Sequence, residues 1–121
     1  MILDALFTVI NPITPASPVI GDEDYPVPCA IYQAEATPIR IKDGIIGFDH
    51  KVSVALIDTD LDRMNTNSEA IITAVTGIAG QTIENTKINT VDHTFENGVI
   101  FDRETGTYQN SFEFDIDADT R

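Results

Sequence analysis

Two segments with alternating apolar and polar residues constrain the fold of this chain most strongly. Along 48–56 the apolar side chains of one face are Phe48, Val52, Val54 and Leu56. Along 107–117 they are Tyr108, Phe112, Phe114 and Ile116. Because successive side chains of a strand point to opposite faces, each segment predicts a strand with one buried face and one solvated face. The chain therefore needs a second layer that covers one side of a sheet.

Two segments with helical spacing can supply that layer. Residues 1–10 repeat apolar side chains on one side and end before Pro12. The second helix is expected to start at Thr66, which with Glu69 resembles a capping box, and to continue with apolar residues at helical spacing up to Gly77 and Gly80.

The segments between the helices predict loops and antiparallel strands. Residues 11–28 hold five prolines and predict an extended loop. Segments 29–35 and 39–41 lead into the turn Asp43-Gly44 and a hairpin with the strand that follows. We therefore predict an α+β fold in one domain of residues 1–121: a two-layer sandwich with a mainly antiparallel sheet and two helices packed on one face.

The charge of the chain excludes several classes of function. It has 20 acidic and 7 basic side chains among 121 residues, a formal net charge of -13. Recognition of nucleic acid or of an anionic membrane needs clustered Lys and Arg, which are scattered here. No apolar run reaches the roughly 18 residues of a membrane span, and residues 1–10 lack the basic start of a signal peptide. We expect synthesis in a cytosol.

The sequence contains no recognisable catalytic or cofactor motif. It has no G-x-S-x-G elbow, no H-E-x-x-H pair and no phosphate-binding glycine loop. Its single cysteine, Cys29, has no partner for an internal disulfide. We expect a protein that is not an enzyme and that holds no cofactor.

One acidic pattern resembles a calcium-binding loop. Its oxygen ligands would occupy positions 1, 3, 5 and 12 of an EF-hand loop, namely Asp58, Asp60, Asp62 and Glu69. Position 6, which requires glycine for a sharp turn, is Arg63. The alternative is a polar loop whose carboxylates precede a helix N-terminus, where the helix dipole favours negative charge.

A second acidic pattern lies near the end of the chain. Glu113, Asp115, Asp117 and Asp119 alternate along one strand face at about 7 Å intervals. They either form a solvated face that runs into a frayed acidic terminus at 115–121, or a surface that repels a negatively charged molecule such as passing DNA.

The arrangement of these segments resembles a known family. Residues 28–33 are similar to its P-x-x-x-Y-Q strand, and 102–114 to its D-x-E-T-G-x-Y-x-x-S-x-x-F closing hairpin. The family is that of the tail completion proteins of long-tailed bacteriophages, also called tail terminator or tail-to-head joining proteins. The resemblance covers nearly the whole chain.

The resemblance implies a structural protein of the virion. Such a protein forms a homohexameric ring on the finished tail tube, ends tube growth and presents a surface to the head connector. Its partners would be copies of itself, the tail tube protein and the connector or stopper protein, while DNA passes without specific binding. Glu113, Asp115 and Asp117 would then face the channel. The alternatives are another neck component, such as a head completion or stopper protein, and a small acidic calcium-dependent binding module.

By the general plan of that family, the loop 11–28 and the hairpin arm 38–48 are candidates for contacts between subunits. Both carry apolar residues outside any obvious core: Val19, Ile20, Ile39, Ile41, Ile45 and Ile46. Exposed apolar loops usually mark interfaces. The alternative is that these residues fold back over the edge of the sheet.

Overall fold

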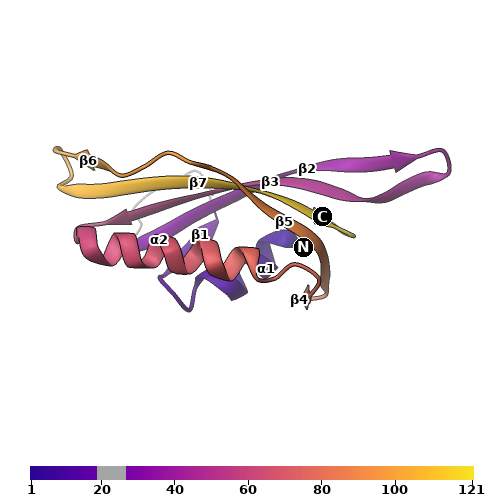
Figure 1. Cartoon of the computed structure of the whole chain (residues 1–121), viewed down its shortest axis with the longest axis horizontal. Helices are drawn as coiled ribbons and strands as arrows, with labels where there is room; N and C mark the ends of the chain where they lie inside the picture. Colours follow the sequence, from indigo (N-terminus) through magenta and orange to yellow (C-terminus); the bar gives the residue numbers. More distant parts are fainter. Residues whose placement is uncertain (19–26) are drawn as a thin grey trace.

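The computed structural model of the protein describes residues 1–18 and 27–121, which form two layers (Figure 1). One layer is a β-sheet, and the other consists of two helices packed on one of its faces. The elements are α1 (Ile2–Ile10), β1 (Ala16–Pro18), β2 (Cys29–Ile41), β3 (Gly44–Asp58), α2 (Leu61–Thr76), β4 (Thr82–Ile83), β5 (Thr86–Glu96), β6 (Ile100–Asp102) and β7 (Thr107–Ala118). The predicted α+β sandwich is confirmed.

The described strands form one mainly antiparallel sheet in the order β1-β2-β3-β7-β5-β4. Only β1 runs parallel to its neighbour β2. Strands β5 and β6 both pair with the same edge of β7, β5 along residues 112–118 and β6 along 107–109. The central ladder joins β3 to β7 and places Val52 opposite Phe114 and Val54 opposite Phe112. The apolar faces predicted for these two strands therefore coincide.

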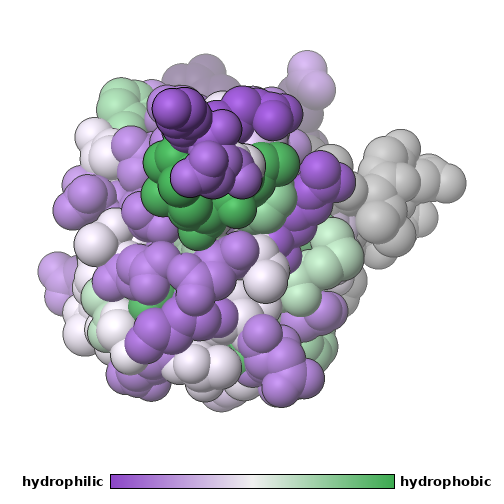
Figure 2. All heavy atoms as spheres, turned by 90° about the vertical axis from the view of Figure 1, so that its right-hand side faces the viewer, coloured by the Kyte–Doolittle hydropathy of each residue, from purple (hydrophilic) through white to green (hydrophobic). Residues whose placement is uncertain are grey.

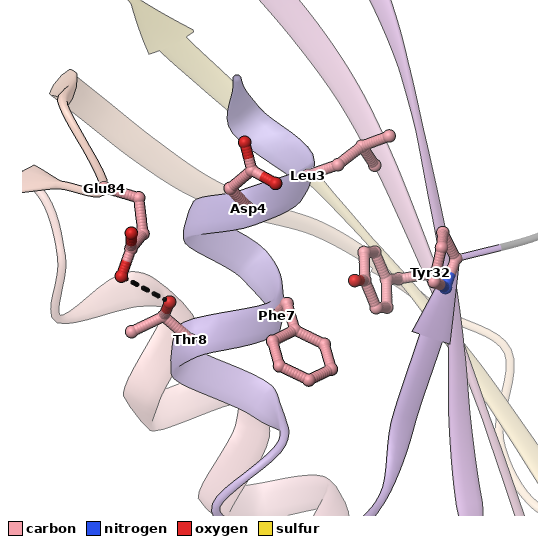
Figure 3. A pocket seen from close by; sticks show the side chains of 7 residues that line it. Leu3, Asp4, Phe7, Thr8, Tyr32 and Glu84 are labelled. Carbon is pink, nitrogen blue, oxygen red and sulfur yellow. Dashed lines mark hydrogen bonds between the residues drawn. The ribbon is translucent and has the colours of Figure 1, made fainter.

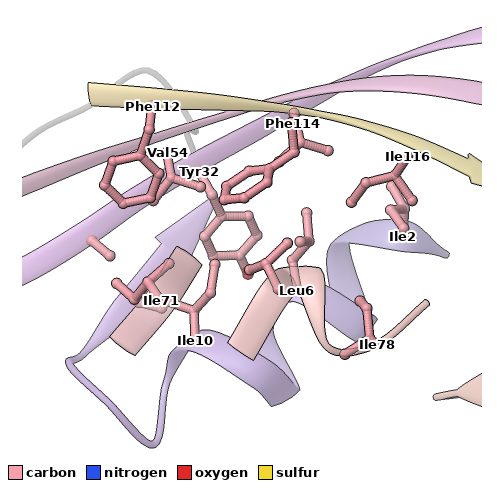
Figure 4. Close-up of a cluster of buried hydrophobic side chains, with 14 of the residues drawn as sticks. Ile2, Leu6, Ile10, Tyr32, Val54, Ile71, Ile78, Phe112, Phe114 and Ile116 are labelled. Atoms are coloured by element: carbon pink, nitrogen blue, oxygen red, sulfur yellow. The ribbon is translucent and has the colours of Figure 1, made fainter. Parts of the chain in front are cut away.

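The core lies between the helices and this apolar face (Figure 4). Leu6 and Ile10 from α1 and Ile71 from α2 are fully buried against the sheet. The sheet contributes large buried side chains from its central strands: Tyr32, Val52, Val54, Phe112, Phe114 and Ile116. Burial of these residues supplies the main stabilisation of the fold.

Part of the predicted proline-rich loop is a strand. Residues 16–18 form β1, and the carbonyl of Pro15 accepts a 2.8 Å hydrogen bond from the amide of Ala30. An edge strand tolerates prolines, because only one of its sides must supply hydrogen bonds to a neighbour. The remaining part of the loop at 19–26, which includes Val19 and Ile20, lies outside the described residues.

Helix α2 starts earlier than the sequence pattern predicts. Its N-cap is Asp60, whose Oδ1 accepts a 3.1 Å hydrogen bond from the amide of Arg63. The proposed capping box at Thr66 and Glu69 therefore falls inside the helix and is wrong. The helix has 16 residues and spans more than four turns. No helix in the described ranges is long and apolar enough to cross a membrane.

The acidic segment 115–121 is anchored rather than frayed. Ile116 and Ala118 are fully buried at the end of β7. Beyond them, the carbonyl of Arg121 accepts a 2.8 Å hydrogen bond from the amide of Ile2. The buried His50 contacts the carbonyl of Thr120 through Nε2 at 3.0 Å. Contacts with α1 and β3 thus hold this end of the chain against the rest of the domain.

The helical layer is shorter than the sheet that it covers. At 1.5 Å per residue the 16 residues of α2 extend about 24 Å. The 15 residues of β3 extend about 50 Å at 3.3 Å per residue. Figure 1 shows the consequence: the β2–β3 hairpin projects beyond the helices at one end, and the β6–β7 turn projects at the other.

We expect buried and exposed side chains of the sheet to contribute very differently to stability. Phe114→Ala should lower the free energy of unfolding by about 3–5 kcal/mol, because Phe114 is fully buried beneath the helices. Phe95→Ala, a matched truncation at a side chain that is 49% exposed, should cost less than about 1 kcal/mol. Urea unfolding followed by circular dichroism measures both, and equal losses would contradict this assignment of the core.

Candidate functional site

The face of the sheet that points away from the helices is acidic. Glu113, Asp115 and Asp117 alternate along β7 with the buried core residues of that strand, so they lie on this open face. The strand register places Asp49 of β3 opposite Asp117 and Asp92 of β5 opposite Asp115. Carboxylates of three neighbouring strands therefore share one surface.

Basic groups neutralise this face only in part. Lys51 Nζ lies 4.0 Å from Asp115 Oδ1, and both side chains are well exposed, so water and salt screen this pair. The amide group of Asn89 donates to Asp117 at 3.2 Å and to Asp119 at 2.9 Å without adding positive charge. The open face thus keeps a negative potential that repels anions.

The shortest charged pair among the described residues joins the end of β3 to the start of α2. The Arg63 guanidinium donates two hydrogen bonds to Asp58, from Nε at 2.7 Å and from Nη2 at 2.6 Å. The amide of Asp60 donates a third, at 3.0 Å. Hydrogen bonding by Arg63 holds the pKa of the Asp58 carboxyl below its usual value. Burial of the carboxyl opposes this shift, and the hydrogen bond from the Asp60 amide adds to it. This arrangement fixes the strand-to-helix connection and accounts for the early start of α2.

The structure does not bring the four carboxylates of the calcium pattern together. Asp58 is occupied by Arg63, and Asp60 caps α2. Asp62 and Glu69 lie within the helix itself, two turns apart, instead of on a loop that wraps an ion. Within residues 1–18 and 27–121, no group of three His, Cys, Asp or Glu residues is placed to hold a metal.

The β2–β3 hairpin carries an exposed apolar tip. Three isoleucines of this tip are about half exposed, namely Ile41 at 51%, Ile45 at 47% and Ile46 at 57%. Ile39 is half-buried on the adjoining part of β2. Figure 2, which views this end of the molecule, shows a hydrophobic patch with hydrophilic side chains in front of it. The exposure of Ile41, Ile45 and Ile46 shows that these three side chains are not buried over the sheet edge. We call Ile41, Ile45 and Ile46 the hairpin tip.

A second exposed apolar group lies at the opposite end of the sheet. Val99, Ile100 and Phe101 are 40%, 57% and 50% exposed, and we call them the β6 patch. Ile100 lies opposite Gln109 on the open face and Phe101 opposite Tyr108 on the helical face, so the patch wraps around this end of the sheet. The sequence analysis did not select these residues, because they precede a polar turn and have no alternation. Their signal in the sequence was three consecutive apolar residues next to a turn.

The turn that follows the β6 patch explains the closing motif of the sequence in physical terms. The Asp102 carboxylate accepts a 2.9 Å hydrogen bond from the amide of Glu104, which closes a local turn. Gly106 has a φ of +68°, a conformation that favours glycine. Tyr108 then packs against Phe101 in a tilted arrangement, with ring centroids 4.9 Å apart. The motif therefore builds a stable turn that holds β6 on β7.

An open hollow of about 580 Å³ lies between α1 and the start of β2 (Figure 3). Leu3 and Phe7 from α1 and Tyr32 from β2 form its apolar part. At its rim, the Thr8 hydroxyl donates a 3.0 Å hydrogen bond to the Glu84 carboxylate. The described lining contains no histidine, cysteine or lysine.

Comparisons with known proteins give a match of fold. No protein family and no curated protein matches the sequence. Among solved structures, a chain of the "Virion of native gene transfer agent (GTA) particle" superposes with a TM-score of 0.67 and 10% sequence identity. The match covers 93% of this chain and 83% of that chain. The two chains therefore share a fold over nearly their whole length.

The Asp58–Arg63 pair gives a prediction on pH dependence. Asp58→Asn should destabilise the protein at neutral pH by about 1–3 kcal/mol, because it weakens charged hydrogen bonds at a buried site. The pKa of Asp58 is lowered by folding, so its contribution is complete above the ordinary carboxyl pKa of about 4 and is lost as the pH falls through the lower folded pKa.

Urea unfolding of both proteins from pH 7 to pH 2 measures this effect. The stability difference between the wild type and Asp58→Asn should be constant above about pH 5 and should shrink below about pH 4. Asp62→Asn, which removes a neighbouring exposed carboxylate, is the matched control. A difference that stays constant throughout the acid range would show that Asp58 is not held ionised by Arg63.

Proposed function

We propose that this protein is a structural protein of a phage or phage-like virion. In this proposal it forms a homohexameric ring on the end of the tail tube, ends tube elongation and forms the interface to the head connector. The observation that carries the proposal is the shared fold, over 93% of this chain, with a chain of a gene transfer agent virion. The strand and closing-hairpin motifs that resemble tail completion proteins point in the same direction.

The acidic open face supports a place beside the DNA channel. DNA carries a dense negative charge and is attracted to Lys and Arg clusters. A lumen lined by Glu113, Asp115 and Asp117 would instead repel the phosphates and let DNA slide without sticking. The open face is suited to this, because no helix of the described residues covers it and its carboxylates come from neighbouring strands.

The proposal assigns roles in assembly and no catalytic step or cofactor. The partners are other copies of this chain, the tail tube protein and the connector or stopper protein. The protein would be made in the cytoplasm of a bacterial host and reside at the head–tail junction of the virion. A head completion or stopper protein, which would bind the portal side rather than the tube, is the alternative within the virion.

Deletion of the gene from the phage or prophage that carries it tests the role directly. We expect electron microscopy to show filled heads lying apart from tails of abnormal length, because tubes without a terminator have no defined end. Expression of the wild-type protein from a plasmid should restore joined particles. Heads that leak DNA beside normal tails would identify a neck component, and intact infectious particles would remove the protein from virion assembly.

Charge reversal tests the channel assignment separately. The double variant Glu113→Lys, Asp115→Lys should assemble normally but lower infectious titre by roughly tenfold or more, because lysines in the lumen would hold the passing DNA. The variant Asp62→Lys, Glu69→Lys changes the net charge equally on helix α2 and is the control. Joined particles are counted by microscopy and infectious titre is measured on the same preparation, which gives the infectious titre per joined particle. Equal values for the two variants would contradict the lumen assignment.

A further inference from the structure

The hairpin tip belongs to an arm that the rest of the domain does not support. Strand β7 pairs with β3 only from Phe48 onward, and β1 pairs with β2 only at residues 30–32. Within the part of the chain that the structure describes, residues 39–47 therefore pair only with each other. A two-stranded hairpin alone is marginally stable in water, and this one places three half-exposed isoleucines at its end. These are the properties of a hairpin that is stabilised when a partner covers its apolar side chains.

The β6 patch offers an apolar surface at the other end of the same sheet. Figure 1 shows the β6–β7 turn and the β2–β3 hairpin at opposite ends of the long axis, so one copy cannot bring the two together. Two copies placed end to end can. The hairpin tip and the β6 patch each hold three apolar side chains of similar exposure, which lie on both faces of their end of the sheet.

The charges around the two surfaces are complementary. The arm carries Arg40 and Lys42 against Asp43, a net positive charge in a chain whose total is -13. Around the β6 patch, Glu96, Asp102 and Glu104 outnumber Arg103 and give a net negative charge. Most other surfaces of two such acidic copies repel each other. The basic tip is therefore directed toward the acidic end of a neighbouring copy rather than toward another tip.

We propose that the hairpin tip of one copy docks on the β6 patch of the next copy, head to tail. This inference rests on the proposed assembly role and names the surfaces that perform it. A contact between two different surfaces leaves one free at each end, so it adds further copies until rotation closes a ring. A contact between identical surfaces would stop at a dimer. The arrangement thus provides a physical basis for a ring.

Site-specific cross-linking tests the contact even where association in solution is weak. The single variants Ile46→Cys and Ile100→Cys place thiols on the two surfaces, both at positions 57% exposed, where the fold should be retained. A short bismaleimide then links cysteines of neighbouring copies. The native Cys29 is buried, and burial, with the nearby Asp58 charge, raises the pKa of its thiol, so wild-type protein serves as the blank.

We expect the mixture of the two variants to form cross-linked dimers at least about tenfold faster than either variant alone, because docking raises the local thiol concentration. Thr73→Cys on the exposed side of α2, mixed with Ile46→Cys, measures random collision. A mixture that links no faster than this control would overturn the contact. Ile46→Cys alone linking as fast as the mixture would replace it by a tip-to-tip dimer.

A pair of charged variants provides an independent test. Ile46→Asp removes the tip and Ile100→Asp removes the β6 patch, and each alone should lower self-association at least about tenfold through a buried unpaired charge. A mixture should form only heterodimers, since each pair retains one intact contact, and analytical ultracentrifugation would detect them. Heterodimers absent from the mixture, with both variants folded, would contradict head-to-tail docking.

The outcomes distinguish this inference from the proposed function. If deletion of the gene disrupts particles but the cysteine mixture does not link, the surfaces named here are wrong and the virion role stands. If the mixture links but deletion leaves particles intact, the contact stands and the virion role fails.

Discussion

A sheet that is longer than its helical cover is the constraint on which the rest of this structure depends. The core forms where α1 and α2 cover the central part of β3 and β7, and there the side chains are fully buried. Beyond the helices the same strands continue, and no other described element covers them there. Apolar residues there, Ile46 at one end and Ile100 at the other, cannot contribute to the core of their own domain. The domain has a closed core, but it leaves apolar side chains exposed at both ends of its sheet.

Because the helices cover only one face of the sheet, the two faces of strand β7 have different roles. Along β7, Phe112, Phe114 and Ile116 hold the helices, while the residues between them form the acidic open face. Strong pairing with β3 and β5 holds these like charges next to each other, although they repel. Such a face is stable only because the other side of the strand is well packed. It can therefore repel an anion such as DNA without loss of the fold.

Sequence alone predicted the elements that depend on regular periodicity. The helix at 1–10, the hairpin about Asp43-Gly44 and the alternating faces of β3 and β7 follow from spacing, because burial on one face dictates it. Prediction from the sequence was wrong where a single polar contact decides the structure. The start of α2 depends on Asp58 binding Arg63, and the pattern of carboxylates alone resembled a calcium loop. The order of residues 115–121 depends on contacts with Ile2 and His50, which are distant in the sequence. The exposure of the β6 patch depends on where the helices end. No local sequence pattern encodes these two features.

The central claim is that this domain works as one subunit of a ring at the end of a tail tube. Cryo-electron microscopy of the head–tail junction, from particles of the phage that carries the gene, tests it most directly. We expect one ring of this fold at the head-proximal end of the tube, with the open face toward the channel and each hairpin arm on a neighbouring subunit. Particles whose junction lacks this fold, or a ring with the helical layer facing the channel, would contradict it.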